Sequence, residues 1–114
     1  MNLEKFREEM ELYWRAIDEE AKELKESYLA LDRLRARYQM FDSVDRSMAD
    51  QVLAEWVLSD DEGMRFDALA LVDEFKIVSA TPALRKLRRR LTSSSAPGAP
   101  YELQKVDRIL RDFE

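Results

Sequence analysis

The chain has 114 residues, of which 46% are apolar and 38% are charged, and its formal net charge is −5 at pH 7. This length fits one domain, and this composition is typical of a globular protein and excludes a disordered chain. The sequence contains no cysteine and no histidine, which excludes disulfides, thiolate chemistry, the commonest general base and the usual zinc sites.

Turn signals are rare in this sequence, because only two glycines and three prolines occur. A β-rich fold needs a turn every few residues, so the sequence predicts an all-α fold. No stretch approaches the roughly 20 apolar residues of a membrane span, and the N-terminus is charged throughout, unlike a signal peptide. We therefore expect a cytoplasmic protein with no membrane contact.

The charge is unevenly distributed along the chain. Residues 1–40 carry 8 basic and 10 acidic groups, residues 41–80 carry 3 and 10, and residues 81–114 carry 8 and 4. The middle of the chain is therefore acidic and its end is basic. Such asymmetry affects the choice of partner and the rate of association, and it does not decide the fold.

The first predicted helix is long and runs from Leu3 to Met40. No glycine or proline occurs before Gly63, and a row of positions seven residues apart is apolar throughout: Leu3, Met10, Ile17, Leu24, Leu31 and Tyr38. A second row falters at Glu20 and Ser27, so the stripe drifts, whereas a coiled-coil seam would stay fixed. A helix of about 60 Å is expected to bend, to pack along the other helices or to pair with another chain.

Three further helices follow a turn at residues 41–43, and the first of them ends near Leu58. Ser59 and Glu62 have the spacing of a capping box, which predicts a helix from Asp60 to about Ile77. That helix is apolar on most sides, including Phe66, as is typical of the central helix of a bundle. Thr81 followed by Pro82 predicts the next helix start. Its inner face is Leu84, Leu87 and Leu91, and its outer face is Arg85, Lys86, Arg88, Arg89 and Arg90.

The last part of the chain begins with SSSAPGAP at residues 93–100, which predicts a flexible linker. Pro100 then opens a fifth helix, which either docks on the domain or extends as an arm. The predicted organisation is therefore a helical domain over residues 1–92, a linker over residues 93–100 and a C-terminal helix over residues 101–114.

A capped acidic turn, an arginine, an Ala-Leu run and a second helix with paired leucines lie within residues 59–91. These features are carried by Asp60, Asp61, Arg65, Ala68, Leu69, Leu71, Pro82, Leu84 and Leu87. The segment resembles a HEAT-type (armadillo-like) helical repeat. The resemblance implies a short helical array or bundle, in which Asp61 and Arg65 would be ladder residues between stacked repeats. It also implies protein partners, because such proteins are mostly binding scaffolds. Repeats need neighbours to bury their faces.

No constellation of residues in the sequence predicts catalysis, a metal site or a cofactor. The acidic run Asp60–Glu62 is explained by helix capping better than by a bound cation. The basic run Arg85–Arg90 is best explained as a solvated face or by pairing with the acidic middle of the chain. Binding to an acidic protein is the second explanation, and binding to nucleic acid is the third. Trp14 lies beside Tyr13, and this pair widens the apolar surface beyond one stripe, so we expect it to contribute to an interface.

We therefore expect a non-catalytic module for protein–protein interaction. One concrete version is an immunity or antitoxin-like inhibitor whose acidic middle covers the basic site of a toxin domain. The alternatives are a homodimer formed through the long N-terminal helix and nucleic-acid binding through the helix at residues 82–91, which the acidic net charge makes unlikely. The residues assigned to partner binding are Tyr13, Trp14, Asp50, Glu55, Asp60, Asp61, Glu62, Arg85, Arg88 and Arg89.

Overall fold

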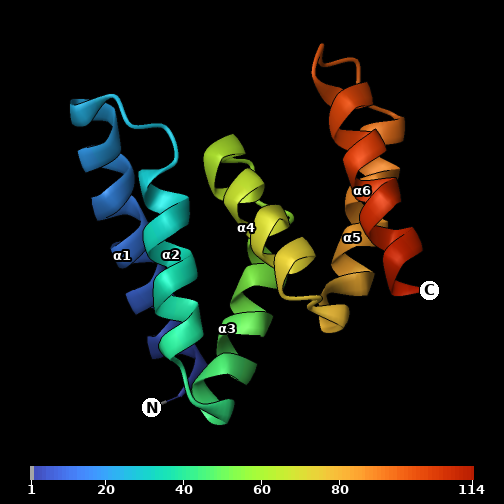
Figure 1. Ribbon diagram of the computed structural model, residues 1–114. Helices are drawn as coiled ribbons and strands as arrows, with labels where there is room; N and C mark the ends of the chain where they lie inside the picture. The colour runs from blue at the N-terminus through green and yellow to red at the C-terminus, as the bar shows by residue number, and fades with distance from the viewer. Residues whose placement is uncertain (1) are drawn as a thin grey trace. The chain divides into compact units, whose positions relative to one another are not determined.

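The structure is a computed structural model that describes residues 2–114 (Figure 1). Within these residues the chain forms six α-helices, one short 3-10 helix and no strand, which confirms the all-α fold. The chain divides into two units, Met1–Val52 (unit 1) and Leu53–Glu114 (unit 2). Helix α3, Ser43–Trp56, begins in unit 1 and ends in unit 2. None of the described helices is long and apolar enough to cross a membrane.

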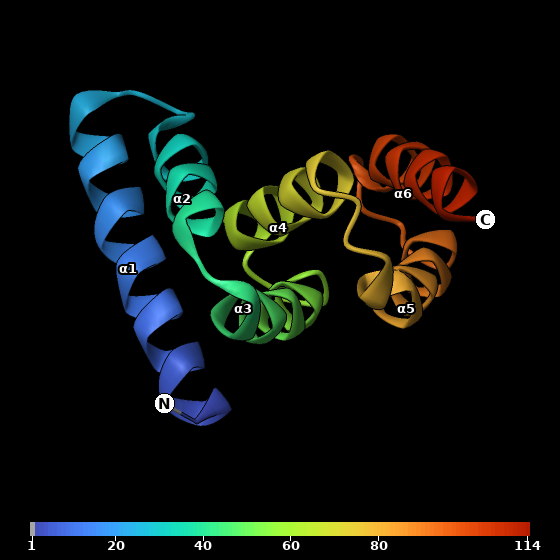
Figure 2. The ribbon, with the colours of Figure 1, turned by 60° about the horizontal axis from the view of Figure 1, so that its bottom comes forward.

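Unit 1 contains α1, Leu3–Leu24, and α2, Leu29–Met40, which lie side by side and run in opposite directions (Figures 1 and 2). The single helix predicted over residues 3–40 is therefore wrong, and this break accounts for the sixth helix. Its two halves pack on each other, which buries Met10, Ile17 and Tyr38 of the apolar row, while Leu24 of the same row stays exposed. The buried side chains of the two helices are Phe6, Met10, Trp14, Ile17, Ala21, Ala30, Leu34 and Tyr38.

Helix α1 ends because Lys25 adopts the left-handed backbone conformation, with φ 56° and ψ 36°. The N–H of Glu26 then donates to the carbonyl of Ala21 at 2.9 Å, which is the hydrogen bond of a Schellman ending. Around this point only Leu24 is apolar in residues 22–27, and it is 56% exposed. A continuous helix would therefore bury nothing here, whereas reversing the chain buries α1 against α2.

Unit 2 contains α4, Glu62–Glu74, the 3-10 helix η1, Val78–Ala80, and the helices α5, Thr81–Thr92, and α6, Ala99–Phe113. Helices α5 and α6 pack side by side in opposite directions (Figure 2). The predicted start of α5 at Thr81–Pro82 is confirmed. The flexibility of residues 93–100 and the division into domains at that linker stay predictions.

The predicted capping box at Ser59 is wrong, because α4 begins later in the chain. The Ser59 hydroxyl accepts a hydrogen bond from the N–H of Asp61 at 3.1 Å, and Asp61 is the N-cap that accepts from the N–H of Met64 at 3.1 Å. The helix is apolar on one broad face, on which Leu69 and Val72 are fully buried. Phe66, which was expected in the core, is 41% exposed.

The core of unit 2 is completed by α5 and α6. The predicted inner face of α5 is confirmed, since Leu84, Leu87 and Leu91 are buried. On α6 the buried apolar side chains include Val106, Ile109 and Leu110. The basic side chains of α5 are left on the surface as predicted, because the leucines use the opposite side of the helix.

Candidate functional site

A groove of about 590 Å³ lies in unit 2 between the start of α4, the end of α5 and the start of α6. Its base includes Leu87 and Leu91 of α5, which are 4% and 9% exposed. Its sides carry two aromatic rings that remain on the surface, Phe66 of α4 at 41% exposure and Tyr101 of α6 at 79%. We call this feature the aromatic groove.

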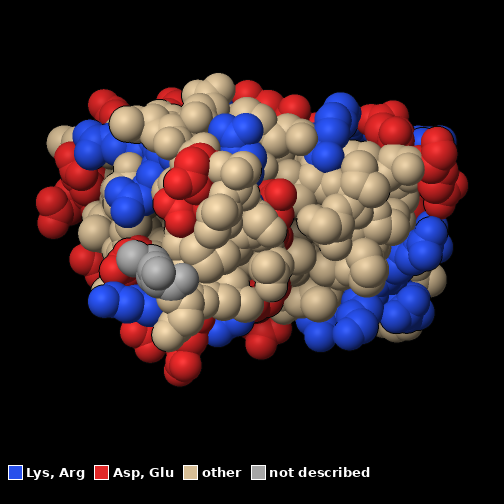
Figure 3. Space-filling view, turned by 90° about the horizontal axis from the view of Figure 1, so that it is seen from below, with Lys and Arg blue, Asp and Glu red and all other residues tan. Residues whose placement is uncertain are grey.

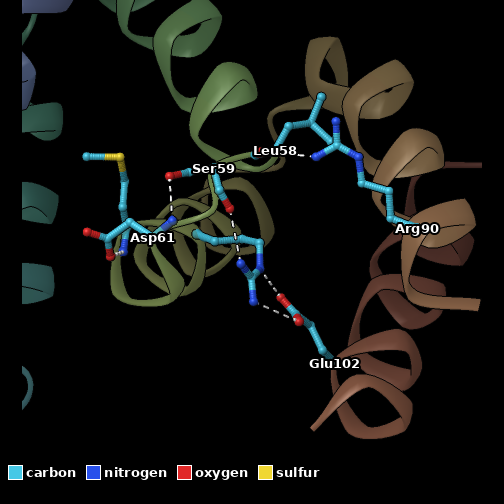
Figure 4. A network of polar contacts seen from close by, with 7 residues as sticks. Leu58, Ser59, Asp61, Arg90 and Glu102 are labelled. Carbon is cyan, nitrogen blue, oxygen red and sulfur yellow. Dashed lines mark hydrogen bonds and ion pairs between the residues drawn. The ribbon is translucent and has the colours of Figure 1, made fainter. Parts of the chain in front are cut away.

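The floor of the aromatic groove holds a buried ion pair between Arg65 of α4 and Glu102 of α6 (Figure 4). Two parallel hydrogen bonds join them, from Nε to Oε1 at 2.5 Å and from Nη2 to Oε2 at 3.2 Å. The third nitrogen, Nη1, donates to the backbone carbonyl of Ser59 at 3.0 Å. The Arg65 and Glu102 side chains are only 17% and 6% exposed, so this pair ties α6 to α4 and to the segment before it.

The electrostatics of the floor keep Arg65 charged. The hydrogen bond to Glu102 raises the pKa of Arg65, and this effect outweighs burial, which lowers the same pKa. The charges of Glu102, Glu62 and Asp60 raise this pKa further. Because every guanidinium nitrogen of Arg65 already donates to an acceptor, an apolar group can cover the pair without leaving it unsatisfied.

The rim of the aromatic groove carries charges of both signs. Asp60 and Glu62 at the start of α4 supply negative charge, and Arg90 of α5 supplies positive charge. Arg90 also donates from Nη1 to the backbone carbonyl of Leu58 at 3.2 Å (Figure 4). An apolar base between aromatic sides, with ions at the rim, is suited to binding an apolar side chain from a partner.

The aromatic pair predicted for an interface is divided between core and surface. Trp14 is 1% exposed and belongs to the core of unit 1, so its side chain does not reach a partner. Tyr13 is half-buried, and its hydroxyl donates to the carbonyl of Arg33 at 3.4 Å. The guanidinium of Arg37 lies 4.3 Å from the centroid of the Tyr13 ring. Both residues therefore have structural contacts within unit 1.

The predicted acidic residues also have different surroundings. Asp50 accepts a hydrogen bond from the Tyr38 hydroxyl at 2.7 Å, and burial, this hydrogen bond and the Asp50 charge together raise the pKa of Tyr38. Asp61 is used as the N-cap of α4. Glu55, Asp60 and Glu62 are exposed, and the last two lie at the aromatic groove.

The predicted basic residues Arg85, Arg88 and Arg89 are all exposed on α5. Basic side chains gather over this helix at the lower right of Figure 3. Arg88 lies 3.8 Å from Asp107 of α6. Arg85 and Arg89 form no ion pair with any carboxylate of unit 2.

The sequence did not assign three groove residues to a site: Phe66, which was expected in the core, Tyr101 and Glu102. Glu102 carried a usable signal, because it shares the inner face of α6 with Val106 and Ile109 at helical spacing. A carboxylate on an apolar face is expected to have a buried partner. Which partner it has is decided by tertiary structure, since Arg65 is 37 residues away.

No group of three or more acidic residues within residues 2–114 is placed to hold a metal ion. Comparisons of the chain with known protein families, with curated proteins and with solved structures found no match.

Proposed function

We propose that the chain is a non-catalytic interaction module that binds another protein through the aromatic groove of unit 2. The observation that carries the proposal is the exposure of Phe66 and Tyr101 in the lining of a groove whose floor holds the Arg65–Glu102 ion pair. Aromatic side chains dominate the energetics of protein interfaces when a partner covers them. The expected occupant is an aliphatic or aromatic side chain of the partner, because the base of the groove is formed by leucines.

Two features of the groove support a binding role. Its aromatic rings stand on helices, so little conformational entropy is lost when a partner covers them. Its volume of about 590 Å³ is within the range of sites that hold small ligands or a few side chains. The resemblance of residues 59–91 to a HEAT-type repeat points to the same kind of function, because such repeats serve mostly as binding scaffolds.

A narrower form of the proposal is an immunity or antitoxin-like inhibitor of a bacterial toxin. The exposure of Asp60 and Glu62 at the aromatic groove supports it, because carboxylates on the surface can meet a basic toxin surface. Co-expression with candidate toxin domains tests this form. This form is supported if co-expression of the unaltered chain rescues growth and the double variant Asp60→Asn/Glu62→Gln does not. Absence of rescue by the unaltered chain would contradict it.

The test of the general proposal is selection of binding peptides from a displayed library of random 16-residue sequences. The full chain serves as bait beside the double variant Phe66→Ala/Tyr101→Ala. The matched control is Leu12→Ala/Tyr28→Ala, which removes two side chains of unit 1 that are 69% and 72% exposed. Enriched peptides are then synthesised, and their affinities are measured by fluorescence anisotropy.

We expect the enriched peptides to contain a large apolar residue and to bind the groove variant about tenfold more weakly, as loss of an interface hot spot implies. The control variant should bind as the unaltered chain does. Equal affinity for the groove variant, or no enrichment at all, would overturn the proposal. Circular dichroism verifies that each variant keeps its helices.

A further inference from the structure

Helix α5 carries a second surface feature, a strip of three basic side chains formed by Arg85, Lys86 and Arg89. All three are exposed, while Leu84 and Leu87 bury the opposite side of the helix. Their spacings of three and four residues place them on adjoining turns, where like charges repel each other. We call them the basic strip.

The side chains of the basic strip are not held in ion pairs inside unit 2. Arg65, Lys76, Arg88 and Arg108 each meet a carboxylate of this unit, but the three side chains of the strip form no such pair. The helix dipole favours cations only in the last turn. It accounts for Arg89 and not for Arg85 and Lys86, which lie in the middle of α5.

The basic strip leads directly to the rim of the aromatic groove. Arg90, which lines the groove, lies one helical turn beyond Lys86 on the same side of α5. Leu87 and Leu91 of the same helix form part of the groove base. A segment that anchors in the groove can therefore continue along the outer face of α5.

We propose that the basic strip binds an acidic segment of the partner protein whose apolar side chain occupies the aromatic groove. This inference rests on the proposed function and adds the chemistry of the partner. Carboxylates at helical spacing on the partner would meet Arg85, Lys86 and Arg89 and form the ion pairs that these side chains do not form inside unit 2. Arginine suits this role because its planar guanidinium donates two parallel hydrogen bonds to a carboxylate.

An acidic protein segment fits the strip better than a nucleic acid does. From Arg85 to Arg89 the strip rises only about 6 Å along the helix axis, which covers very few phosphates of a duplex. Negative charge flanks it, with Asp107 3.8 Å from Arg88 and Asp60 and Glu62 at the groove. These groups oppose a continuous polyanion, and α5 contains no aromatic residue on which a base could stack.

The test repeats the peptide selection with two more full-length baits. The strip variant is Arg85→Gln/Lys86→Gln/Arg89→Gln. The control variant, Lys5→Gln/Lys22→Gln/Arg33→Gln, changes the net charge equally at exposed positions of unit 1. We expect the unaltered chain and the control to enrich peptides with an excess of Asp and Glu beside the apolar residue. The strip variant should enrich peptides without that excess and should bind the acidic ones about tenfold more weakly.

The outcomes separate this inference from the proposed function. If the unaltered chain enriches apolar peptides without an excess of Asp and Glu, the inference is overturned and the proposed function of the groove is kept. Acidic peptides that bind the strip but bind the Phe66→Ala/Tyr101→Ala variant equally well would overturn the groove and keep the strip. No enrichment on any bait overturns both. A last outcome concerns other anions. If the unaltered chain shows no preference for acidic peptides but binds a 20-base-pair DNA or anionic lipid vesicles, and the strip variant does not bind them, the strip is assigned to that ligand and the inference is overturned.

Discussion

Units 1 and 2 each contain an antiparallel pair of helices, but the polar contacts between the helices of each unit use different side chains. In unit 1 most polar contacts between helices involve aromatic rings, beside one exposed ion pair of Arg33 with Glu20 at 3.6 Å. Tyr13 of α1 contacts Arg33 and Arg37 of α2, and Tyr38 of α2 donates to Asp50 of α3. In unit 2 ion pairs join α4 to α6, with Arg65 paired to Glu102 and Arg108 paired to Asp73.

This difference separates two sources of stability. Aromatic packing depends on buried area and shape and responds little to pH or salt, whereas ion pairs depend on protonation and on whether each partner is present. We therefore expect unit 1 to be most sensitive to loss of a buried ring. Unit 2 should be most sensitive to loss of one member of its buried pair.

The largest expected effect is in unit 1, at Trp14. The substitution Trp14→Ala removes a side chain that is 1% exposed, and truncation of a buried tryptophan typically costs about 3–5 kcal/mol. The free energy of unfolding, measured by urea denaturation followed by circular dichroism, should fall by about this amount. Leu12→Ala, at a position that is 69% exposed, should change it by less than about 0.5 kcal/mol. Similar losses in both variants would contradict the placement of Trp14 in the core.

The next largest effect is in unit 2, at Glu102. Glu102→Leu leaves the buried Arg65 guanidinium without its carboxylate, which should cost about 3 kcal/mol. The double variant Arg65→Met/Glu102→Leu removes both charges and should recover most of that loss in the same urea measurement. Asp107→Asn breaks the exposed pair with Arg88 and should cost no more than about 1 kcal/mol. A Glu102→Leu loss as small as that of Asp107→Asn would show that the pair does not hold unit 2 together.

The sequence predicted the elements whose signals are local. The proline after Thr81 and the leucine spacing of α5 act within one helix, so its start and its buried face were confirmed. The aromatic groove was not predicted, because it brings together residues from α4, α5 and α6. Phe66 was expected in the core and Tyr101 was assigned no role, and the packing of the helices leaves both exposed.

The end of α1 was missed for a different physical reason. The left-handed position that closes a helix is usually glycine or asparagine, but in this chain Lys25 occupies it. The conformational cost at one lysine is only about 1 kcal/mol, which the packing of α2 on α1 easily exceeds. A local pattern cannot report a break whose stabilisation comes from a contact formed elsewhere.

The C-terminal ends of α1 and α4 can be compared directly, because Lys25 after α1 and Lys76 after α4 both have positive φ, 56° and 52°. Lys25→Gly should relieve backbone strain and raise the free energy of unfolding by about 0.5–1 kcal/mol. Lys76→Gly should gain less, because Lys76 also lies 3.5 Å from Asp73 and 3.8 Å from Asp112. Lys22→Gly, inside α1, should instead lose about 1 kcal/mol. Thermal melts distinguish the three variants, and a loss in Lys25→Gly would contradict the Schellman ending.

The smallest effect is the acid response of unit 2 at Asp73. Burial alone would raise the pKa of Asp73, but the hydrogen bond and charge of Arg108, with Lys76, outweigh it and lower this pKa below its ordinary value. A carboxyl whose pKa is lower in the folded state stabilises the protein above its unfolded pKa, and the contribution is lost as the pH falls through the folded pKa. Asp73→Asn should therefore cost about 0.5 kcal/mol at pH 7, a value kept small by solvent screening.

That cost should shrink towards zero as the pH is lowered from 5 to 3, because the unaltered chain then loses the same interaction by protonation. Urea denaturation at a series of pH values measures the difference. Arg108→Gln removes the partner that lowers the pKa and should flatten the same part of the profile. A difference between the unaltered chain and Asp73→Asn that stays constant from pH 7 to pH 3 would assign the effect of Asp73 to packing, and unit 2 would then resemble unit 1 in its response to acid.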